Sequence, residues 1–550
     1  MPPVKKRPAG NVNMIKLQPP APTKHKKSRK IPEQAPEEPQ PPAEQPAAFA
    51  PPEPHISETE ASWATLAATP AAHHPDWAVA FVQGLMAADV LQKGTAGPRE
   101  ITLRVWSDCG GLATEMFSAK ELSTALENLC GITVKWILYC YCDQDARAHT
   151  FVKANHAPLH ASTNMEQRNM RDGKYWCSLH QENHDLPKSG IDVYVAGYPC
   201  SPWSRRGLRT GFDHPDIKPF LIGMETIEYM KPAVWMMETV AGAGDVKAGQ
   251  EKSGLQQVLE HVRKTVRTPY HSQLAQNVTP LFHGYPVRRP RFFLINVRLD
   301  ACEARVLEDA ARSVLANPLP VRHSYFDFLG LTRDVDWSRV DQLPEPAEQR
   351  LLDPSCKCSL DPTVACPIHK CGHSCGKCGP AGNGCTWRSK MKDFIASHNI
   401  DLLSSARSGK LTYVQVLELS RGHAAGPQNP RQRNMLNVYA LLPRSYPLND
   451  TLLLADLSQA VDRDGMRYDG TSPTLATNSQ WWCFQAGMFL TVPHKAALQG
   501  FRIDQLKFPT SCTEPFFRER LGLGIHVASM GAMLLAAVAG PLNRLASMKQ

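Results

Sequence analysis

Between residues 100 and 300, short apolar runs alternate with stretches of helical periodicity. The runs ITLRVWS, VKWILYCYC, IDVYVAG, AVWMMETV and FFLINVRL are rich in β-branched and aromatic residues, which predicts strands. Helix-forming stretches follow the first two runs, at 112–129 and 146–155, and an apolar helical pattern over 77–93 is expected to pack on the core. This alternation predicts an α/β fold with a doubly wound, mostly parallel sheet.

The first 75 residues have a different character. They are crowded with Pro, Ala, Glu and Gln and have few bulky apolar residues, so we expect a disordered tail. The first thirty residues contain nine Lys or Arg and no acid, in clusters such as KKR and KHKKSRK. Such clusters bind nuclear-import receptors or polyphosphates, which predicts a nuclear protein, with a merely solvated tail as the alternative.

Composition narrows the class of protein. The chain of 550 residues is 42% hydrophobic and 21% charged, which suits about two to four folded units. Neither a membrane span nor a secretory signal peptide is expected, because no run of about 18 or more apolar residues without charge appears and the N-terminus is basic and proline-rich with no apolar core. The 16 cysteines then favour thiolate chemistry or metal ligation over disulfides. A net charge of +9 indicates an anionic partner, nucleic acid first.

One cysteine stands where α/β sheets place their chemistry. Cys200 follows the predicted strand IDVYVAG and is flanked by Pro199 and Pro202. Open α/β sheets bind ligands outside the carboxyl ends of their strands, so the thiol would be presented for reaction. Arg205 and Arg206 would favour the thiolate or contact phosphates. A buried structural cysteine is the alternative.

A nucleoside cofactor is indicated nearby. Gly110 and Gly111 follow the first predicted strand, where glycines let a ligand approach the backbone. Asp143 follows the second strand, where an acid can bind ribose hydroxyls. A tight turn explains the two glycines equally well.

Six segments, taken in order, resemble the motifs of the cytosine-5 DNA methyltransferases. They are residues 106–112, 196–204, 237–240, 284–291, 472–474 with 490–501, and 522–529. The likeness covers roughly 100–300 and 470–540. It implies a Rossmann-like methyltransferase fold, S-adenosylmethionine as cofactor, and a target cytosine in DNA that is flipped out of the duplex.

The resemblance also implies roles for single residues. Cys200 would add to carbon 6 of cytosine, and Glu238 would donate to ring nitrogen 3, unless it only caps a turn. Arg289 would reach the base oxygen and orient Glu238, and Arg291 would brace the Cys200 loop, unless both contact phosphates. Trp106 would pack against the cofactor. The residues implied to bind the cofactor are Trp106, Gly110, Gly111, Leu112, Asp143 and Pro199.

The chain departs from the family pattern at five positions. These are Asp108, Tyr198, Thr239, Val287 and Leu523. We expect an acid at 108 to be tolerated or favourable beside a cationic sulfonium, whereas Leu523 removes hydrogen bonds near the cofactor. The departures leave two alternatives to a DNA methyltransferase: an RNA cytosine-5 methyltransferase of the transfer-RNA type, or a catalytically silent nucleic-acid-binding or scaffold protein.

A Cys-rich insert separates the two parts that resemble the family. We expect a first catalytic part at 76–300, a target-recognition region at 301–465 and a C-terminal part at 466–545 that completes the catalytic domain. A structural zinc knot is predicted at 356–385, with reactive thiols or disulfides as alternatives. Its candidate ligands are Cys356, Cys358, Cys366, His369, Cys371, His373, Cys375, Cys378 and Cys385. Arg431 and Arg433, in a second arginine-rich string, are predicted to contact DNA.

Overall fold

A computed structural model describes most of the chain. The described residues are 14–17, 72–92, 99–204, 209–247, 249–331, 386–398, 453–461 and 465–548, with single residues between 432 and 439. Several predictions lie outside them. These are the predictions for Arg205, Arg206, Arg431, Arg433, the zinc knot at 356–385 and the tail apart from 14–17 and 72–75.

An eight-stranded sheet forms the centre of the molecule, in the order β1-β9-β10-β8-β7-β2-β3-β4. Its strands are β1 (Met14–Leu17), β2 (Arg99–Asp108), β3 (Ile132–Cys142), β4 (His160–Ser162), β7 (Val193–Ala196), β8 (Val234–Val240), β9 (Tyr270–Val278) and β10 (Arg291–Arg298). The pairs from β4 through β3, β2 and β7 to β8 are parallel, and those of β10 and β1 are antiparallel. This arrangement confirms the predicted doubly wound, mostly parallel sheet.

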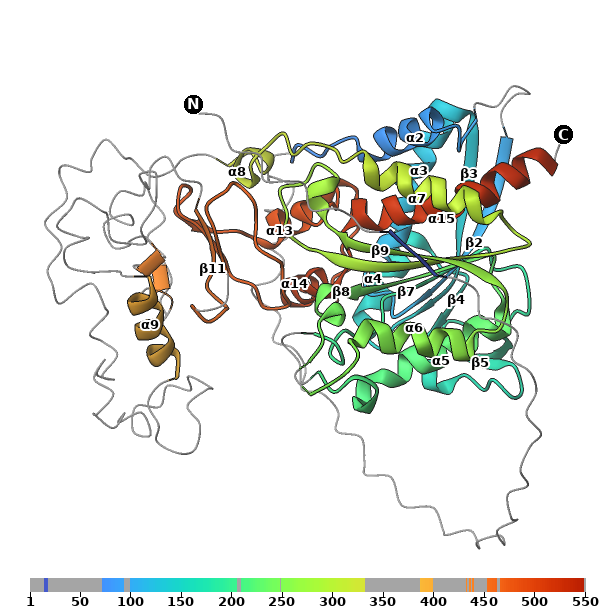
Figure 1. Cartoon of the computed structure of the whole chain (residues 1–550), viewed down its shortest axis with the longest axis horizontal. Coiled ribbons are helices and arrows are strands. Elements are labelled where there is room, and N and C mark those ends of the chain that lie inside the picture. The colour runs from blue at the N-terminus through green and yellow to red at the C-terminus, as the bar shows by residue number, and fades with distance from the viewer. Residues whose placement is uncertain are drawn as a thin grey trace, which may run out of the picture.

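Helices cover both faces of the sheet (Figure 1). One layer holds α2 (Trp77–Ala87), α3 (Thr114–Cys130), α7 (Ala304–Ala316) and α15 (Val527–Met548), and the other holds α5 (Lys218–Met230) and α6 (Gly254–Thr265). Strand β7 shows why both faces need cover. Val193 and Val195 join the apolar cluster of the first layer, whereas Tyr194 and Ala196 join the cluster of the second, because side chains alternate along a strand.

Three strands of the central sheet, β1, β4 and β9, were not predicted. β9 has no regular alternation of apolar and polar residues and no continuous apolar run. β1, Met14–Leu17, lies inside the tail that we expected to be disordered, and it pairs with β9. Three of its four residues are bulky and apolar, and the edge of β9 offers unpaired backbone groups to them.

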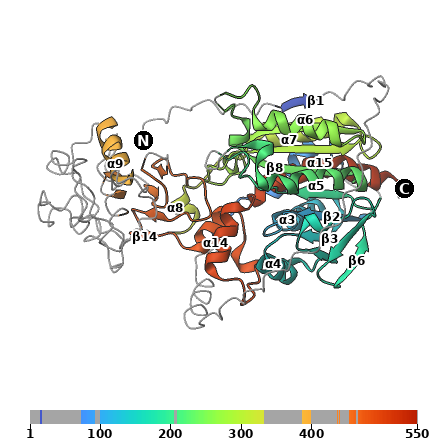
Figure 2. The ribbon, with the colours of Figure 1, turned by 90° about the horizontal axis from the view of Figure 1, so that it is seen from below.

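The C-terminal segment returns to the first half of the chain. Helix α15 packs against α3 and α7, and the Ser118 hydroxyl donates to the carbonyl of Val527 at 2.7 Å. Ser472 joins the segment before β10, since its N–H donates to the Pro286 carbonyl at 2.7 Å. Figure 2 shows α14 (Glu514–Leu523) beside α4 (Ala146–His156).

Smaller elements surround this core. A four-stranded sheet contains β12 (Met466–Arg467), β11 (Leu454–Asp456), β13 (Trp481–Cys483) and β14 (Met488–Phe489). The remaining helices include α8 (Tyr325–Phe328), α9 (Thr386–Ser397) and α13 (Val492–Leu498). A hairpin of β5 (Lys174–Cys177) and β6 (Glu182–Asp185) lies beside β4. No single described helix is long and apolar enough to cross a membrane; α14 and α15 pass that test only as a pair bent by 47°.

Candidate functional site

Four parallel strands end on one line. Asp108, the last residue of β2, lies opposite Cys142 of β3 and Ala196 of β7, and Ala196 lies opposite Met237 of β8. The loops that leave these strands therefore start at the same edge of the sheet. Ligands of open α/β sheets bind at this edge.

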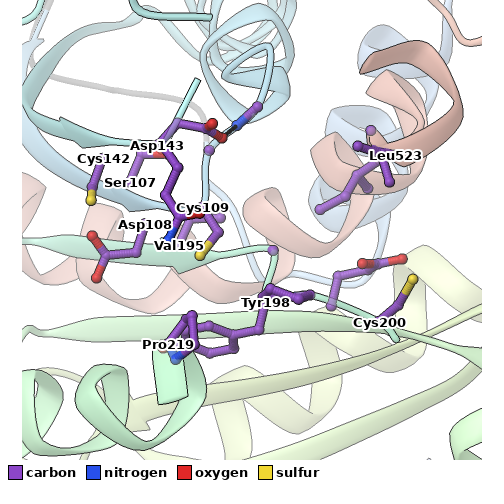
Figure 3. Close-up of a pocket in the computed structure, with 18 of the residues that line it drawn as sticks. Ser107, Asp108, Cys109, Cys142, Asp143, Val195, Tyr198, Cys200, Pro219 and Leu523 are labelled. Atoms are coloured by element: carbon purple, nitrogen blue, oxygen red, sulfur yellow. Dashed lines mark hydrogen bonds between the residues drawn. The ribbon is translucent and has the colours of Figure 1, made fainter. Parts of the chain in front are cut away.

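These loops and α14 line a cavity of about 380 Å³, a size that suits a small-molecule ligand. Figure 3 shows Cys200 and Tyr198 on the loop after β7, Asp143 after β3, and Leu523 across the cavity. The predicted residues that line it are Gly110, Gly111, Asp143, Pro199, Cys200, Glu238, Arg289 and Arg291. The structure thus brings together segments that are far apart in the sequence, from the glycine turn at Gly110 to Leu523 in α14.

Cys200 is held in a tight turn. Its carbonyl accepts hydrogen bonds from the N–H groups of Trp203, at 3.0 Å, and Ser204, at 2.7 Å, and its side chain is partly exposed. Burial raises the pKa of the Cys200 thiol and the nearby Glu238 raises it further, while Arg291 and Arg289 act in the opposite direction. Burial and, after it, the charges around the cavity therefore shift the ionisation of the thiol, and their net effect favours the protonated form.

Glu238 forms an ion pair with Arg291, with 2.6 Å between Oε1 and Nε. Both side chains are almost buried. The expectation that Arg289 orients Glu238 is wrong, and the reason lies in the sheet. Arg291 is the first residue of β10, which pairs antiparallel with β8. It lies opposite Val240, only two residues along β8 from Glu238.

Arg289 instead binds the C-terminal segment. Its guanidinium donates to the carbonyls of Leu475 at 2.6 Å, Gly522 at 2.9 Å and Gly524 at 2.6 Å. The side chain is only 2% exposed. Charge-assisted bonds of this kind are stronger than neutral ones, so Arg289 fixes the segment 522–524 where it lines the cavity.

The glycine turn after β2 meets the acid after β3. The N–H of Gly111 donates to Asp143 Oδ2 at 2.9 Å, and Gly111 has a φ of +54°, which favours glycine. A Cβ on Gly110 would lie 2.7 Å from the ring of Tyr141. Arg520 of α14 lies 3.5 Å from Asp143 Oδ1. The Asp143 carboxylate is thus held at the cavity wall by groups from two segments.

Two predicted cofactor residues lie elsewhere. Trp106 and Leu112 are buried in the two apolar clusters and do not line the cavity. Trp106 lies opposite Tyr194 in the register and shares its face of the sheet, where its ring contacts Tyr175 edge-on. The expectation that Trp106 packs against the cofactor is therefore wrong, since the alternation along β2 turns it toward the helix layer of α5 and α6.

Asp108 belongs to a buried network. Arg168 pairs with both of its carboxylate oxygens, one of them at 2.6 Å, and the Trp106 indole donates to it at 3.0 Å. The Tyr194 hydroxyl also donates to Asp108 and lies 3.2 Å from the Tyr198 hydroxyl. Two departures from the family pattern, Asp108 and Tyr198, are therefore joined through Tyr194. Because Arg168 neutralises Asp108, our expectation that this acid favours a sulfonium is not supported.

The other departures have different surroundings. Thr239 and Val287 are buried, and Val287 bridges to Ser472. Leu523 lines the cavity and is 51% exposed, so an apolar surface stands where the family has an amide.

Sequence reasoning missed Arg168, Arg520 and Glu115. Glu115 lies in the first turn of α3 and lines the cavity, and burial raises its pKa to about 7. An acid shortly after the glycine turn was a visible signal for Glu115. The acid at 108 was an indirect signal for Arg168, because a buried carboxylate requires a cation.

A family model describes the same region. Residues 137–319 match the model of the C-5 cytosine-specific DNA methylases. This match confirms the predicted family resemblance. The matched range contains Cys200, Glu238, Arg289 and Arg291, and it begins after the glycine turn. The chain is thus similar to the C-5 cytosine-specific DNA methylases over residues 137–319.

Individual proteins are also similar to the chain. The type II methyltransferase M.PspPI of Psychrobacter sp. (strain TA137) is 29% identical over 112 residues, which cover 20% of this chain and a quarter (25%) of that protein. A putative DNA modification methyltransferase encoded within a prophage (E. coli) has 14% identity and a TM-score of 0.42, covering 80% of this chain and 99% of its own. The Dnmt2 methyltransferase of S. pombe has 15% identity and a TM-score of 0.38, with the same coverage of both chains.

The charges around Cys200 predict how its reactivity responds to substitution. Alkylation of Cys200 by iodoacetamide, followed by mass spectrometry of its peptide, should accelerate as the pH rises toward the raised pKa, because the thiolate is the nucleophile. Glu238→Gln should accelerate the reaction at a fixed pH, and Arg291→Ala should slow it. Equal rates in the three proteins would contradict this electrostatic account.

The Asp108–Arg168 pair predicts a recovery of stability. Arg168→Met should cost about 3–5 kcal/mol in the free energy of unfolding, because it leaves a buried carboxylate unpaired. Adding Asp108→Gly to that variant removes the orphaned charge and should restore part of the loss, as measured by urea denaturation. If the double variant is as unstable as the sum of the single variants, the pair does not act as a unit.

Proposed function

We propose that this protein transfers a methyl group from S-adenosylmethionine to carbon 5 of cytosine in DNA, through a covalent bond to Cys200. One observation carries the proposal: a single cavity is lined by the Cys200 thiol, the Glu238–Arg291 ion pair, and the glycine turn that binds Asp143. This combination supplies a nucleophile, a proton donor and a nucleoside site within one space.

The cavity suits S-adenosylmethionine on the side of the glycine turn. Gly111 has open space beside its Cα, so a ligand can approach the backbone there. Asp143 would accept from the ribose hydroxyls. Glu115, whose carboxyl lines the same wall, would stabilise positive charge once it is ionised. When bound, S-adenosylmethionine supplies an electrophilic methyl group.

Cys200 and Glu238 divide the chemistry of the base between them. Once deprotonated, the Cys200 sulfur adds to carbon 6, and the electron pair of the 5,6 double bond moves to carbon 5, which accepts the methyl group. Loss of the proton from carbon 5 and release of the thiolate then restore the double bond. Glu238 would take up the proton that Cys200 releases and, in this protonated form, donate to ring nitrogen 3 and offset the charge that builds on the ring, while Arg291 holds Glu238 in place.

Two considerations favour DNA over RNA. The net charge of +9 suits any nucleic acid and does not discriminate between them. The first consideration is that the matching family model is named for DNA methylases. The second is that the Psychrobacter relative is named as a type II methyltransferase. A cytosine within a duplex is out of reach unless it is flipped into the cavity. RNA remains the alternative substrate, because the same groups would act on its cytosine.

Trapping on 5-fluorocytosine tests the proposal. A fluorine at carbon 5 cannot leave as a proton, so the base should remain bonded to the enzyme in the presence of S-adenosylmethionine. We expect a denaturation-resistant adduct with duplex DNA, lost in Cys200→Ser and retained in Cys109→Ser, which removes a second thiol from the same cavity. The adduct is measured by gel shift and mass spectrometry.

The remaining outcomes separate the alternatives. An adduct with RNA but not with DNA would replace the substrate and keep the mechanism. No adduct with either, together with no heat of S-adenosylmethionine binding by calorimetry, would contradict the enzymatic role and favour a silent nucleic-acid-binding protein.

A further inference from the structure

A second group of chemistry-bearing side chains lies away from the cavity. His160, Cys177, His180 and His184 each offer one ligand atom, and these four atoms lie within 4.8 Å of one another. Cys177 is buried, His160 and His184 are half-buried, and His180 is exposed. Their convergence needs an explanation, since three imidazoles and a thiol have little reason to share one point otherwise.

The local chain brings the four residues together. His160 opens β4 at the edge of the central sheet, and the other three lie on the β5–β6 hairpin in the pattern Cys-x2-His-x3-His. The N–H of Ser178 donates to the Ala161 carbonyl at 2.7 Å, which ties the hairpin to β4. Two strands of four residues are marginal on their own, so the hairpin needs further support.

The separations match those of a metal site. Cys177 Sγ lies 3.4 Å from His180 Nδ1 and 3.9 Å from His160 Nδ1, and His180 Nδ1 lies 2.9 Å from His184 Nε2. Tetrahedral zinc, with bonds of about 2.3 Å to sulfur and about 2.0–2.1 Å to nitrogen, places sulfur and nitrogen about 3.6 Å apart and two nitrogens about 3.4 Å apart. Small movements of the imidazoles would meet this geometry.

We propose that His160, Cys177, His180 and His184 bind a structural zinc ion that fastens the β5–β6 hairpin to the edge of the catalytic sheet. Three nitrogens and one thiolate in tetrahedral array favour Zn²⁺ over the hard cations Mg²⁺ and Ca²⁺, which prefer oxygen ligands. Four protein ligands fill the coordination sphere and leave no open position for a substrate, which is typical of a structural ion.

The hairpin carries a link to the cavity. Asn169 forms a β-bridge with Lys174 at the start of β5. The residue before Asn169 is Arg168, which pairs with Asp108 at the end of β2, just before the glycine turn. The zinc ion would therefore help to hold the segment that places Arg168. This role does not depend on the proposed reaction, because it concerns the packing of the hairpin.

Metal analysis of the full chain tests the site. The zinc content of the purified protein, measured by inductively coupled plasma mass spectrometry, should fall by one equivalent per chain in Cys177→Ala. Cys130→Ser removes another buried thiol from the same domain and should leave the content unchanged. The difference between variants isolates this site from any zinc bound at 356–385.

A second variant guards against simple misfolding. His184→Cys exchanges one zinc ligand for another and should retain the full equivalent. With Co²⁺ in place of zinc, it should strengthen the thiolate-to-cobalt absorption relative to the unsubstituted protein. Full zinc content in Cys177→Ala, or no change in the cobalt spectrum of His184→Cys, would overturn the proposal. Loss of one equivalent with retention in His184→Cys would support it.

Discussion

The parallel register of β2, β3, β7 and β8 is the constraint on which the site depends. Because Asp108, Cys142, Ala196 and Met237 lie level with one another, the four loops that follow must open on the same edge. A slip of one residue in any pair would turn each side chain of that strand to the other face. The register therefore decides that a thiol, a glycine turn and two acids share one cavity.

Buried ionic contacts hold the surroundings of that edge. Arg168 neutralises Asp108 beneath the glycine turn, Arg291 pairs with Glu238, and Arg289 binds three carbonyls of the C-terminal segment. Each guanidinium joins segments that are distant in sequence. The departures at 108 and 198 belong to this system, since Tyr194 links their side chains. Together they form a connected polar network.

Most of the parallel strands and the residues at their ends could be predicted from the sequence, because the pattern of apolar runs and their composition indicate a parallel sheet and its carboxyl edge. The direction in which individual side chains point could not be predicted. Trp106 turned out to face the α5 layer, and Arg291 rather than Arg289 pairs with Glu238, because both outcomes depend on pairing between strands that the sequence does not display. Asp108 signals the need for a cation, but only the fold identifies Arg168 as that cation, because tertiary contact brings it 2.6 Å from Asp108. β9 was missed because its alternation is weak.

The most direct measurement follows the methyl group itself. Protein is incubated with duplex DNA and S-adenosylmethionine carrying an isotopically labelled methyl group, and the nucleosides are then separated by mass spectrometry. The account predicts label in 5-methylcytosine, falling to background in Cys200→Ser. Label on the exocyclic nitrogen of cytosine, or undiminished 5-methylcytosine from Cys200→Ser, would contradict it.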